Sequence, residues 1–321
     1  MTRHRRKFPV FLGVLVLLAT ACGRESEEST TPAAPSGDLS GSVEVDGSST
    51  VGPLVTAAAE QFQGEQPDVQ VTVGISGTGG GFERFCAGET DISNASRPIK
   101  DDEEAPICQQ NGVEYTELQV ATDALTVVTN KENDWVDCLT TDQLKTIWEP
   151  GAEGEVTRWK QIDPSFPEEK LTLAGPGTDS GTFDYFTDEI NGEEGASRSD
   201  YQASEDDNTI VTFVSGETGA LGYFGFSYFE ENQDTLNAVP IDGGNGCVAP
   251  SVDAAQAGEY TPLSRPLFIY VKNESLQRPE VKAFVQHMLD NAQSIAETAQ
   301  FVPLNDEQLA ESMSRFEQAS G

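Results

Sequence analysis

The 321-residue sequence predicts an α/β protein with largely parallel sheets, preceded by an N-terminal export signal. Three observations support this prediction. Strand-like and helix-like stretches alternate from about residue 42 to the C-terminus. Several strands run directly into turns of glycine, serine and threonine that precede a helix. Without the signal and the polar segment after it, about 280 residues remain, a length that suits two domains of ordinary size.

Residues 1–21 are typical of a secretory signal peptide. Four basic residues within the first seven precede an apolar stretch, residues 8–21, that is too short to span a membrane. Small residues before Cys22 favour a lipoprotein cleavage site, with the acylated Cys22 as the new N-terminus; an ordinary cleavage site beside a free cysteine is the alternative. Residues 22–41 are polar and rich in proline and serine, which predicts a flexible, lipid-anchored tether.

The charge of the exported chain excludes some classes of partner. The signal holds four of the 19 basic residues and no acidic one, so 15 basic residues face 54 acidic ones, a formal charge of −39. Such a surface argues against nucleic acid and anionic membranes as partners. It does not exclude a small anion, because surface charges are screened beyond roughly 8 Å, whereas buried hydrogen-bond donors act at contact distance.

The alternating pattern places the elements in chain order. Strands are expected at residues 42–45, 69–73, 91–95, 125–128, 171–173 and 267–271. Helices are expected after the first two strands, at residues 181–190 and near the C-terminus. The last has an apolar stripe with helical spacing, which predicts a helix packed on a core: Val281, Phe284, Val285, Met288 and Leu289. His287 lies off this stripe, so we expect it at the surface. Asn208 is expected to cap another helix.

Three strand-to-helix turns of small residues are the most informative feature. They comprise residues 47–51, 77–81 and 177–182. Each helix start exposes unpartnered backbone N–H groups at the positive end of the helix dipole, and hydroxyls add further donors. Capping and turn formation would explain any one of them alone. Three at strand ends of one α/β chain favour a binding site for a tetrahedral anion.

One further segment offers a cation. Arg97 follows the short strand at residues 91–95, and its guanidinium could bind an oxyanion through two parallel hydrogen bonds, as a bidentate ligand. The alternative is a surface ion pair, which is common in a chain so rich in carboxylates.

Several motifs, taken together, resemble the phosphate-binding proteins of bacterial Pst-type ABC importers, in particular the SphX-like branch. The motifs are DGSSTVGP, GISGTGGGFERFCAGETDISNASRPI, GPGTDSGTFDYF, SEDDN, GALGYFGFSYF and PLSRPLFIYV. The resemblance implies a two-lobed periplasmic-binding-protein type II fold with a ligand cleft between the lobes. Lobe 1 would take residues 42–122 and 264–321, and lobe 2 residues 123–263. It also implies capture of inorganic phosphate outside the cytoplasmic membrane and delivery to ABC permease subunits.

The resemblance also implies which residues contact phosphate. They fall in the three turns and after the third strand: Ser49, Thr50, Val51, Thr78, Ser96, Ser180, Gly181 and Thr182. The chain departs from the family at two positions. Better-known members have Ser-Asp where this chain has Ser96-Arg97. They also carry an arginine shortly before Ser-Gly-Thr, where this chain has Pro176. We therefore expect Arg97 to replace that cation. Asp179 is the expected acceptor of the phosphate proton, although it could simply cap the helix.

The cysteines predict disulfides rather than a metal site. Four remain besides Cys22, an even set in an exported protein, with three possible pairings. The lobe division favours Cys86–Cys108 and Cys138–Cys247, one in each lobe. No CxxC motif is present and only one histidine lies outside the signal, so neither a metal nor another cofactor is expected.

Other functions remain as alternatives. A phosphatase-like enzyme using Ser49 or Ser180 would need a base, and His287 is the only histidine beyond the signal, so we predict no enzymatic activity. The same fold could bind sulfate, arsenate or molybdate, or serve as a sensor or adhesin lipoprotein. The primary prediction is a monomeric phosphate-binding lipoprotein at the outer face of the cytoplasmic membrane.

Overall fold

The computed structural model describes residues 39–178 and 180–321. The predicted signal peptide, Cys22 and Asp179 lie outside the described residues. Residues 39–41, which we assigned to the tether, contact the fold: Leu39 packs against a hydrophobic core and its N–H donates to Gln66 at 3.2 Å. Over the described ranges, no helix has the length and hydrophobicity needed to cross a membrane.

One nine-stranded sheet runs through the molecule in the order β2-β1-β3-β12-β4-β8-β6-β7, with β9 also paired to β4. The strands are β1 (Gly41–Gly47), β2 (Val69–Val73), β3 (Ile92–Ala95), β4 (Tyr115–Asn130), β6 (Thr172–Gly175), β7 (Gln202–Ala203), β8 (Ala220–Gly225), β9 (Leu236–Ala238) and β12 (Ser264–Lys272). A small second sheet contains β5 (Leu139–Thr140), β10 (Ile241–Asp242) and β11 (Cys247–Val248).

The sheet is parallel only towards its two ends. Strand β1 pairs in parallel with β2 and β3, and β6 with β7 and β8. In the middle, β12 is antiparallel to β3 and β4, and β4 is antiparallel to β8. The expectation of largely parallel strands therefore overlooked the centre, where two long strands carry the chain between the two halves.

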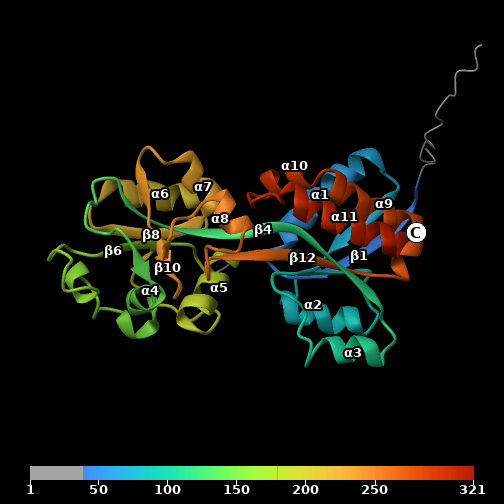
Figure 1. Cartoon of the computed structure of the whole chain (residues 1–321), viewed down its shortest axis with the longest axis horizontal. Coiled ribbons are helices and arrows are strands. Elements are labelled where there is room, and N and C mark those ends of the chain that lie inside the picture. The colour runs from blue at the N-terminus through green and yellow to red at the C-terminus, as the bar shows by residue number, and fades with distance from the viewer. Residues whose placement is uncertain (1–38, 179) are drawn as a thin grey trace, which may run out of the picture. The chain divides into compact units, whose positions relative to one another are not determined.

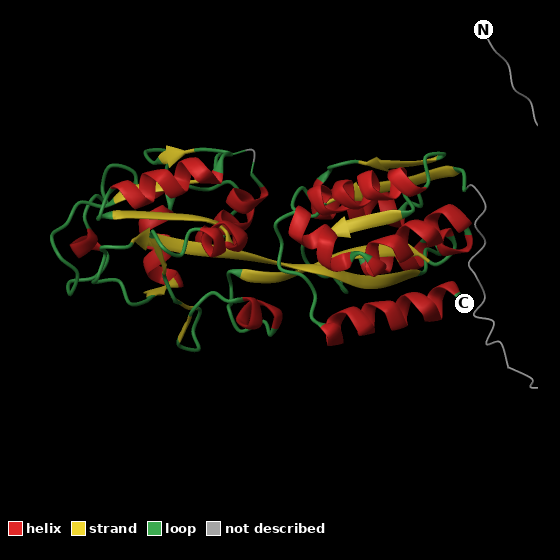
Figure 2. Cartoon of the chain, turned by 90° about the horizontal axis from the view of Figure 1, so that it is seen from above, coloured by secondary structure: helices red, strands yellow, loops and turns green. Residues whose placement is uncertain are grey.

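Strands β4 and β12 run side by side through both halves (Figure 1, Figure 2). Ala121 and Leu267 belong to one large hydrophobic core, whereas Leu125 and Leu263 belong to another. We call the half around the first core lobe 1 and the half around the second core lobe 2. The two strands therefore pass from lobe to lobe within a few residues of Asp123 and Arg265, which lie opposite each other in the ladder.

Helices cover both faces of the sheet in each lobe. In lobe 1, α1 (Gly52–Glu65), α9 (Pro279–Asp290), α10 (Ala292–Thr298) and α11 (Asp306–Ser320) lie on one face, and α2 (Gly77–Cys86) and α3 (Ala105–Gln110) on the other (Figure 1). Lobe 2 contains α4 (Thr141–Trp148), α5 (Gly181–Phe186), α6 (Asp207–Gly216), α7 (Phe226–Glu231) and α8 (Val252–Gln256). Short irregular helices are η1 (Pro150–Ala152), η2 (Trp159–Gln161), η3 (Thr187–Asn191) and η4 (Ser275–Gln277).

Two local expectations were wrong. The apolar stripe of α9 is buried as predicted, but His287 is buried as well. Its ring packs against Phe62 of α1, with ring centroids 5.4 Å apart, because α1 covers a wider face of α9 than the stripe indicated.

Helix α6 is capped by Asp206, whose carboxylate accepts from the backbone N–H of Asn208 at 3.0 Å, so Asn208 is inside the helix.

Both favoured disulfides are present. Cys86–Cys108 links the end of α2 to α3, and Cys138–Cys247 links the segment before β5 to β11. Each bond therefore joins elements within one lobe.

The first turn of α6 predicts a pH-dependent stability. Burial of the Asp207 carboxyl, together with the negative charges of Asp206 and Glu205, raises its pKa to about 6. Between about pH 4 and pH 6 the folded chain keeps a proton that the unfolded chain has lost, so this group's contribution to stability falls as pH rises through that window. We expect Asp207→Asn to be more stable than the parent by about 1–2 kcal/mol at pH 7, with no advantage below pH 4.

Urea unfolding of both proteins at pH 4, 5, 6 and 7 measures this difference. Asp253→Asn, at an exposed carboxylate in the first turn of α8, is the matched control. A stability difference for Asp207→Asn that stays constant across the series would contradict the prediction.

Candidate functional site

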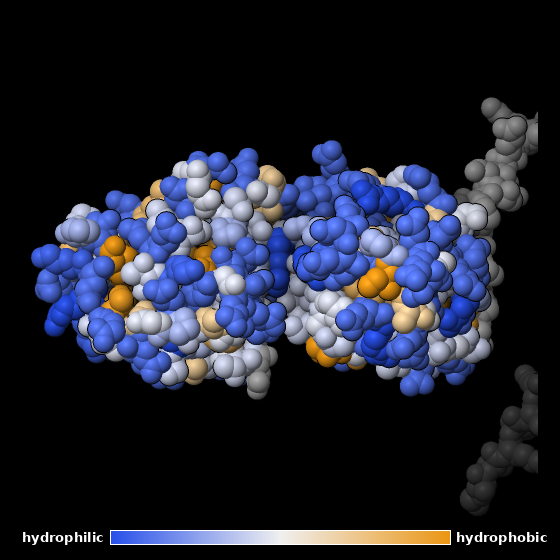
Figure 3. Space-filling view, turned by 90° about the horizontal axis from the view of Figure 1, so that it is seen from below, coloured by the Kyte–Doolittle hydropathy of each residue, from blue (hydrophilic) through white to orange (hydrophobic). Residues whose placement is uncertain are grey.

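A polar cavity of about 470 Å³ lies beyond the carboxyl ends of β1, β2 and β3. Lobe 1 supplies the Ser/Thr/Gly turns, β12 supplies Arg265 and Pro266, and lobe 2 supplies residues of α5, η3 and the following loop. Figure 3 shows a hydrophilic groove between the two halves of the described chain. The lining residues are Ser48, Ser49, Thr50, Ser76, Gly77, Thr78, Gly79, Gly80, Ser96, Arg97, Pro98, Asp184, Tyr185, Asp188, Glu189, Glu194, Arg265 and Pro266.

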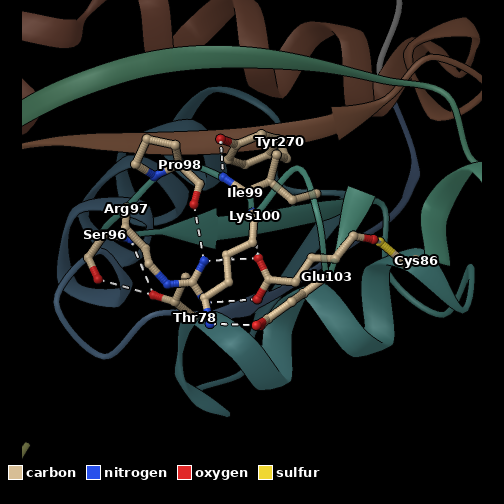
Figure 4. A network of polar contacts seen from close by, with 10 residues as sticks. Thr78, Cys86, Ser96, Arg97, Pro98, Ile99, Lys100, Glu103 and Tyr270 are labelled. Carbon is tan, nitrogen blue, oxygen red and sulfur yellow. Dashed lines mark hydrogen bonds and ion pairs between the residues drawn. The ribbon is translucent and has the colours of Figure 1, made fainter. Parts of the chain in front are cut away.

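The first two predicted turns meet at this cavity. The turn after β1 is held by the hydroxyl of Ser48, which accepts from the N–H of Val51 at 3.3 Å. In the first turn of α2, the Thr78 hydroxyl lies 3.1 Å from the Ser96 hydroxyl, and it accepts from the Ser96 N–H at 3.3 Å (Figure 4). Three segments from three strand ends thus bring hydroxyl groups together, and the third of them is the segment with Ser96 rather than the predicted turn at residues 177–182.

A buried carboxylate that sequence analysis missed joins these two turns. Asp46 is the next-to-last residue of β1, and its Oδ1 accepts from the N–H of Gly47 at 2.7 Å and from the N–H of Ser76 at 3.0 Å. Arg84 of α2 donates to its Oδ2. One side chain therefore fixes the turn after β1, the turn after β2 and the helix that follows.

Arg97 lines the cavity but is paired with a carboxylate. Its two Nη groups donate to the two carboxylate oxygens of Glu104 at 2.9 and 2.7 Å, and Nη1 also donates to the Pro98 carbonyl at 3.0 Å (Figure 4). This donation to Glu104 raises the pKa of the Arg97 guanidinium. The surface ion pair that we considered as the alternative is thus present in the structure.

A second arginine, which sequence analysis did not single out, lies in the same cavity. Arg265 Nη2 donates to the hydroxyl of Thr50 at 3.0 Å, and Nε donates to Asp123 at 3.3 Å. Its guanidinium stacks on the ring of Tyr185 from lobe 2, 3.6 Å from the centroid. The available signal was a basic residue beside a proline at the start of the apolar strand in PLSRPLFIYV.

The third predicted turn lies beside the cavity rather than in its lining. Ser180 caps α5, with its hydroxyl accepting from the Thr182 N–H at 3.2 Å, as capping alone would explain. Gly181 lies against lobe 1, since a Cβ placed on it would be 3.0 Å from the Thr50 hydroxyl. In the described part of the chain, neither these residues nor the fully buried Val51 are among the cavity-lining residues.

Lobe 2 instead faces the cavity with carboxylates that sequence analysis also missed: Asp184, Asp188, Glu189 and Glu194. Burial raises the pKa of the Asp184 carboxyl, and the nearby negative charge of Glu194 raises it further. Burial also raises the pKa of the Glu189 carboxyl, and the negative charge of Asp188 adds to this effect. No group of three or more His, Cys, Asp or Glu residues suited to a metal ion occurs within residues 39–178 and 180–321.

Two α/β lobes joined by strands around a polar cavity are the arrangement of a solute-binding protein. Residues 32–292 match the family model described as a PBP superfamily domain. The chain belongs to this superfamily and, within it, to the family of phosphate-binding proteins that includes SphX and PstS.

The relatives cover most of the chain. Protein SphX of Synechocystis sp. is 48% identical over 83% of this chain and 79% of that protein. The phosphate-binding protein PstS of Staphylococcus saprophyticus is 38% identical over 95% of this chain and 92% of that protein.

Solved structures agree with these relatives. A possible phosphate-binding protein from Planctomyces limnophilus superposes with a TM-score of 0.84 at 43% identity, covering 88% of this chain and all of that chain. A putative phosphate transporter substrate-binding protein from Clostridium perfringens, solved with bound phosphate, has a TM-score of 0.54 at 27% identity, covering 83% of this chain and 100% of that one.

Proposed function

We propose that this protein binds inorganic phosphate outside the cytoplasmic membrane and delivers it to an ABC-type permease. The observation that carries the proposal is the convergence of Ser49, Thr50, Thr78 and Ser96, from three strand ends, on one cavity. Their hydroxyls and the neighbouring backbone N–H groups suit a tetrahedral oxyanion. The names of the relatives and the phosphate bound in the Clostridium perfringens protein support phosphate as that oxyanion.

The energetics of such a site are compatible with an acidic exterior. Each hydrogen bond to a charged partner contributes roughly 1.5–3 kcal/mol, and micromolar binding needs only about −8 kcal/mol net. Several donors at contact distance therefore offset desolvation, while surface carboxylates beyond roughly 8 Å are screened. The function needs no nucleophile and no base, which fits a binding protein rather than an enzyme. We propose that this binding protein is a monomer.

The proposal includes export and anchoring. The signal-like residues 1–21 and the small residues before Cys22 support a lipid anchor on Cys22, with residues 22–38 as the tether, because residues 39–41 contact the fold. Lobe 1 would comprise residues 42–122 and 264–321, and lobe 2 residues 123–263. In this arrangement the third turn, with Ser180 and Thr182, would approach the ligand from lobe 2, and Asp179 would accept its proton.

The test is a calorimetric titration of the unlipidated mature chain with phosphate, arsenate and sulfate. We expect phosphate to bind with micromolar or tighter affinity, arsenate to compete, and sulfate to bind at least tenfold more weakly. No binding heat and no thermal stabilisation by phosphate would refute the proposal. Preferential binding of sulfate would favour the alternative oxyanion.

A further inference from the structure

We propose that Arg265, and not Arg97, is the cation that contacts the bound phosphate. This inference rests on the proposed function. It concerns which of the two arginines that line the cavity, among the residues the structure describes, has its charge available to the ligand.

Three of the five N–H groups of the Arg97 guanidinium donate to protein acceptors, two of them to Glu104. Both Nη groups are committed to the two oxygens of Glu104, which also accepts from the backbone N–H of Lys100 at 2.9 Å. The Glu104 side chain is only 14% exposed. Turning Arg97 towards an anion would leave this carboxylate largely buried without its cation, which is costly.

Arg265 is held in place while part of its guanidinium stays available. Asp123, its partner across the β4–β12 ladder, is engaged only through Nε, and the Tyr185 ring supports the guanidinium plane. Nη2 points to Thr50, a residue of the first anion-binding turn. Across residues 39–178 and 180–321, no hydrogen bond from Nη1 to a protein acceptor is found.

The place of Arg265 in the fold strengthens this assignment. It lies where the strands pass between the lobes, and it contacts Thr50 of lobe 1 and Tyr185 of lobe 2. An anion bound to Nη1 and Nη2 would therefore lie beside both lobes at once. Asp123 is buried, and Arg265 is the charged group with which it pairs. This ion pair holds the Arg265 guanidinium in a fixed orientation.

The experiment compares Arg265→Gln with the matched control Arg97→Gln by calorimetric titration with inorganic phosphate. We expect the affinity of Arg265→Gln to fall roughly 10- to 100-fold, because a charge-assisted hydrogen bond is lost, and that of Arg97→Gln to change less than threefold. Arg265→Lys, which keeps the charge but not the planar fork, should lie between Arg265→Gln and the parent.

A second variant separates binding from folding. Arg265→Gln leaves the Asp123 carboxylate buried without its cation, so the double variant Asp123→Asn/Arg265→Gln replaces the ion pair by a neutral pair and should lose the same affinity. If both variants fail to fold, Arg97→Gln decides: unchanged affinity supports the inference, and a tenfold loss overturns it.

The outcomes also separate this inference from the proposed function. Parental affinity in folded Arg265→Gln overturns the inference and leaves phosphate binding intact. Absence of phosphate binding by the parent protein refutes the proposed function, and the inference falls with it.

Discussion

A Gly181→Ala variant is expected to bind phosphate roughly tenfold or more weakly than the parent, while the ligand-free protein unfolds at an unchanged temperature. The added Cβ would lie 3.0 Å from the Thr50 hydroxyl and 3.3 Å from the Thr50 Cα. Overpacking of this kind costs roughly 1–3 kcal/mol. We expect this cost to fall on the closed, binding-competent arrangement of the lobes, so that it lowers the population of that state and raises the apparent Kd.

Calorimetry and thermal unfolding with and without phosphate measure both effects. The control is Gly64→Ala at the end of α1, where nothing lies within 4 Å of the added Cβ. It should leave phosphate affinity unchanged and raise stability by up to about 1 kcal/mol. Parental affinity in Gly181→Ala would show that the contact between Gly181 and Thr50 plays no part in binding.

Removing the lobe-2 disulfide is expected to destabilise the protein more than removing the lobe-1 disulfide. Cys138 and Cys247 are 109 residues apart in the sequence, whereas Cys86 and Cys108 are 22 apart. In the chain-entropy description, the longer loop corresponds to about 5 kcal/mol and the shorter loop to about 3 kcal/mol.

Denaturant unfolding of the two double alanine variants tests this order. Each variant serves as the control for the other, because each removes one disulfide within one lobe. A larger loss for the Cys86/Cys108 variant would mean that local packing, and not loop length, determines the effect.

Local patterns predicted the two lobe-1 turns that line the cavity, whereas Ser96 came from the family resemblance. Ser96 follows β3 directly, Thr50 lies three residues after β1 and Thr78 five residues after β2, and the carboxyl ends of adjacent parallel strands meet at one edge of a sheet. For the two turns, the alternation of strands and helices together with the small-residue turns contained the necessary information.

The charged part of the site depends on contacts between distant residues. Arg265 lies opposite Asp123 only because β12 pairs with β4 in one particular register, across 142 positions of sequence. Asp46 likewise reaches Ser76 across 30 positions. The pairing of Arg97 with Glu104 spans only 7 positions, so it could have been weighed from the sequence.

The double strand of β4 and β12 has a mechanical consequence. Because these two hydrogen-bonded strands join the lobes, a relative movement of the lobes would have to bend or twist the β4–β12 ladder. The ladder shifts register between Leu267 and Phe268, two residues beyond Arg265, and an irregularity of this kind bends a strand locally.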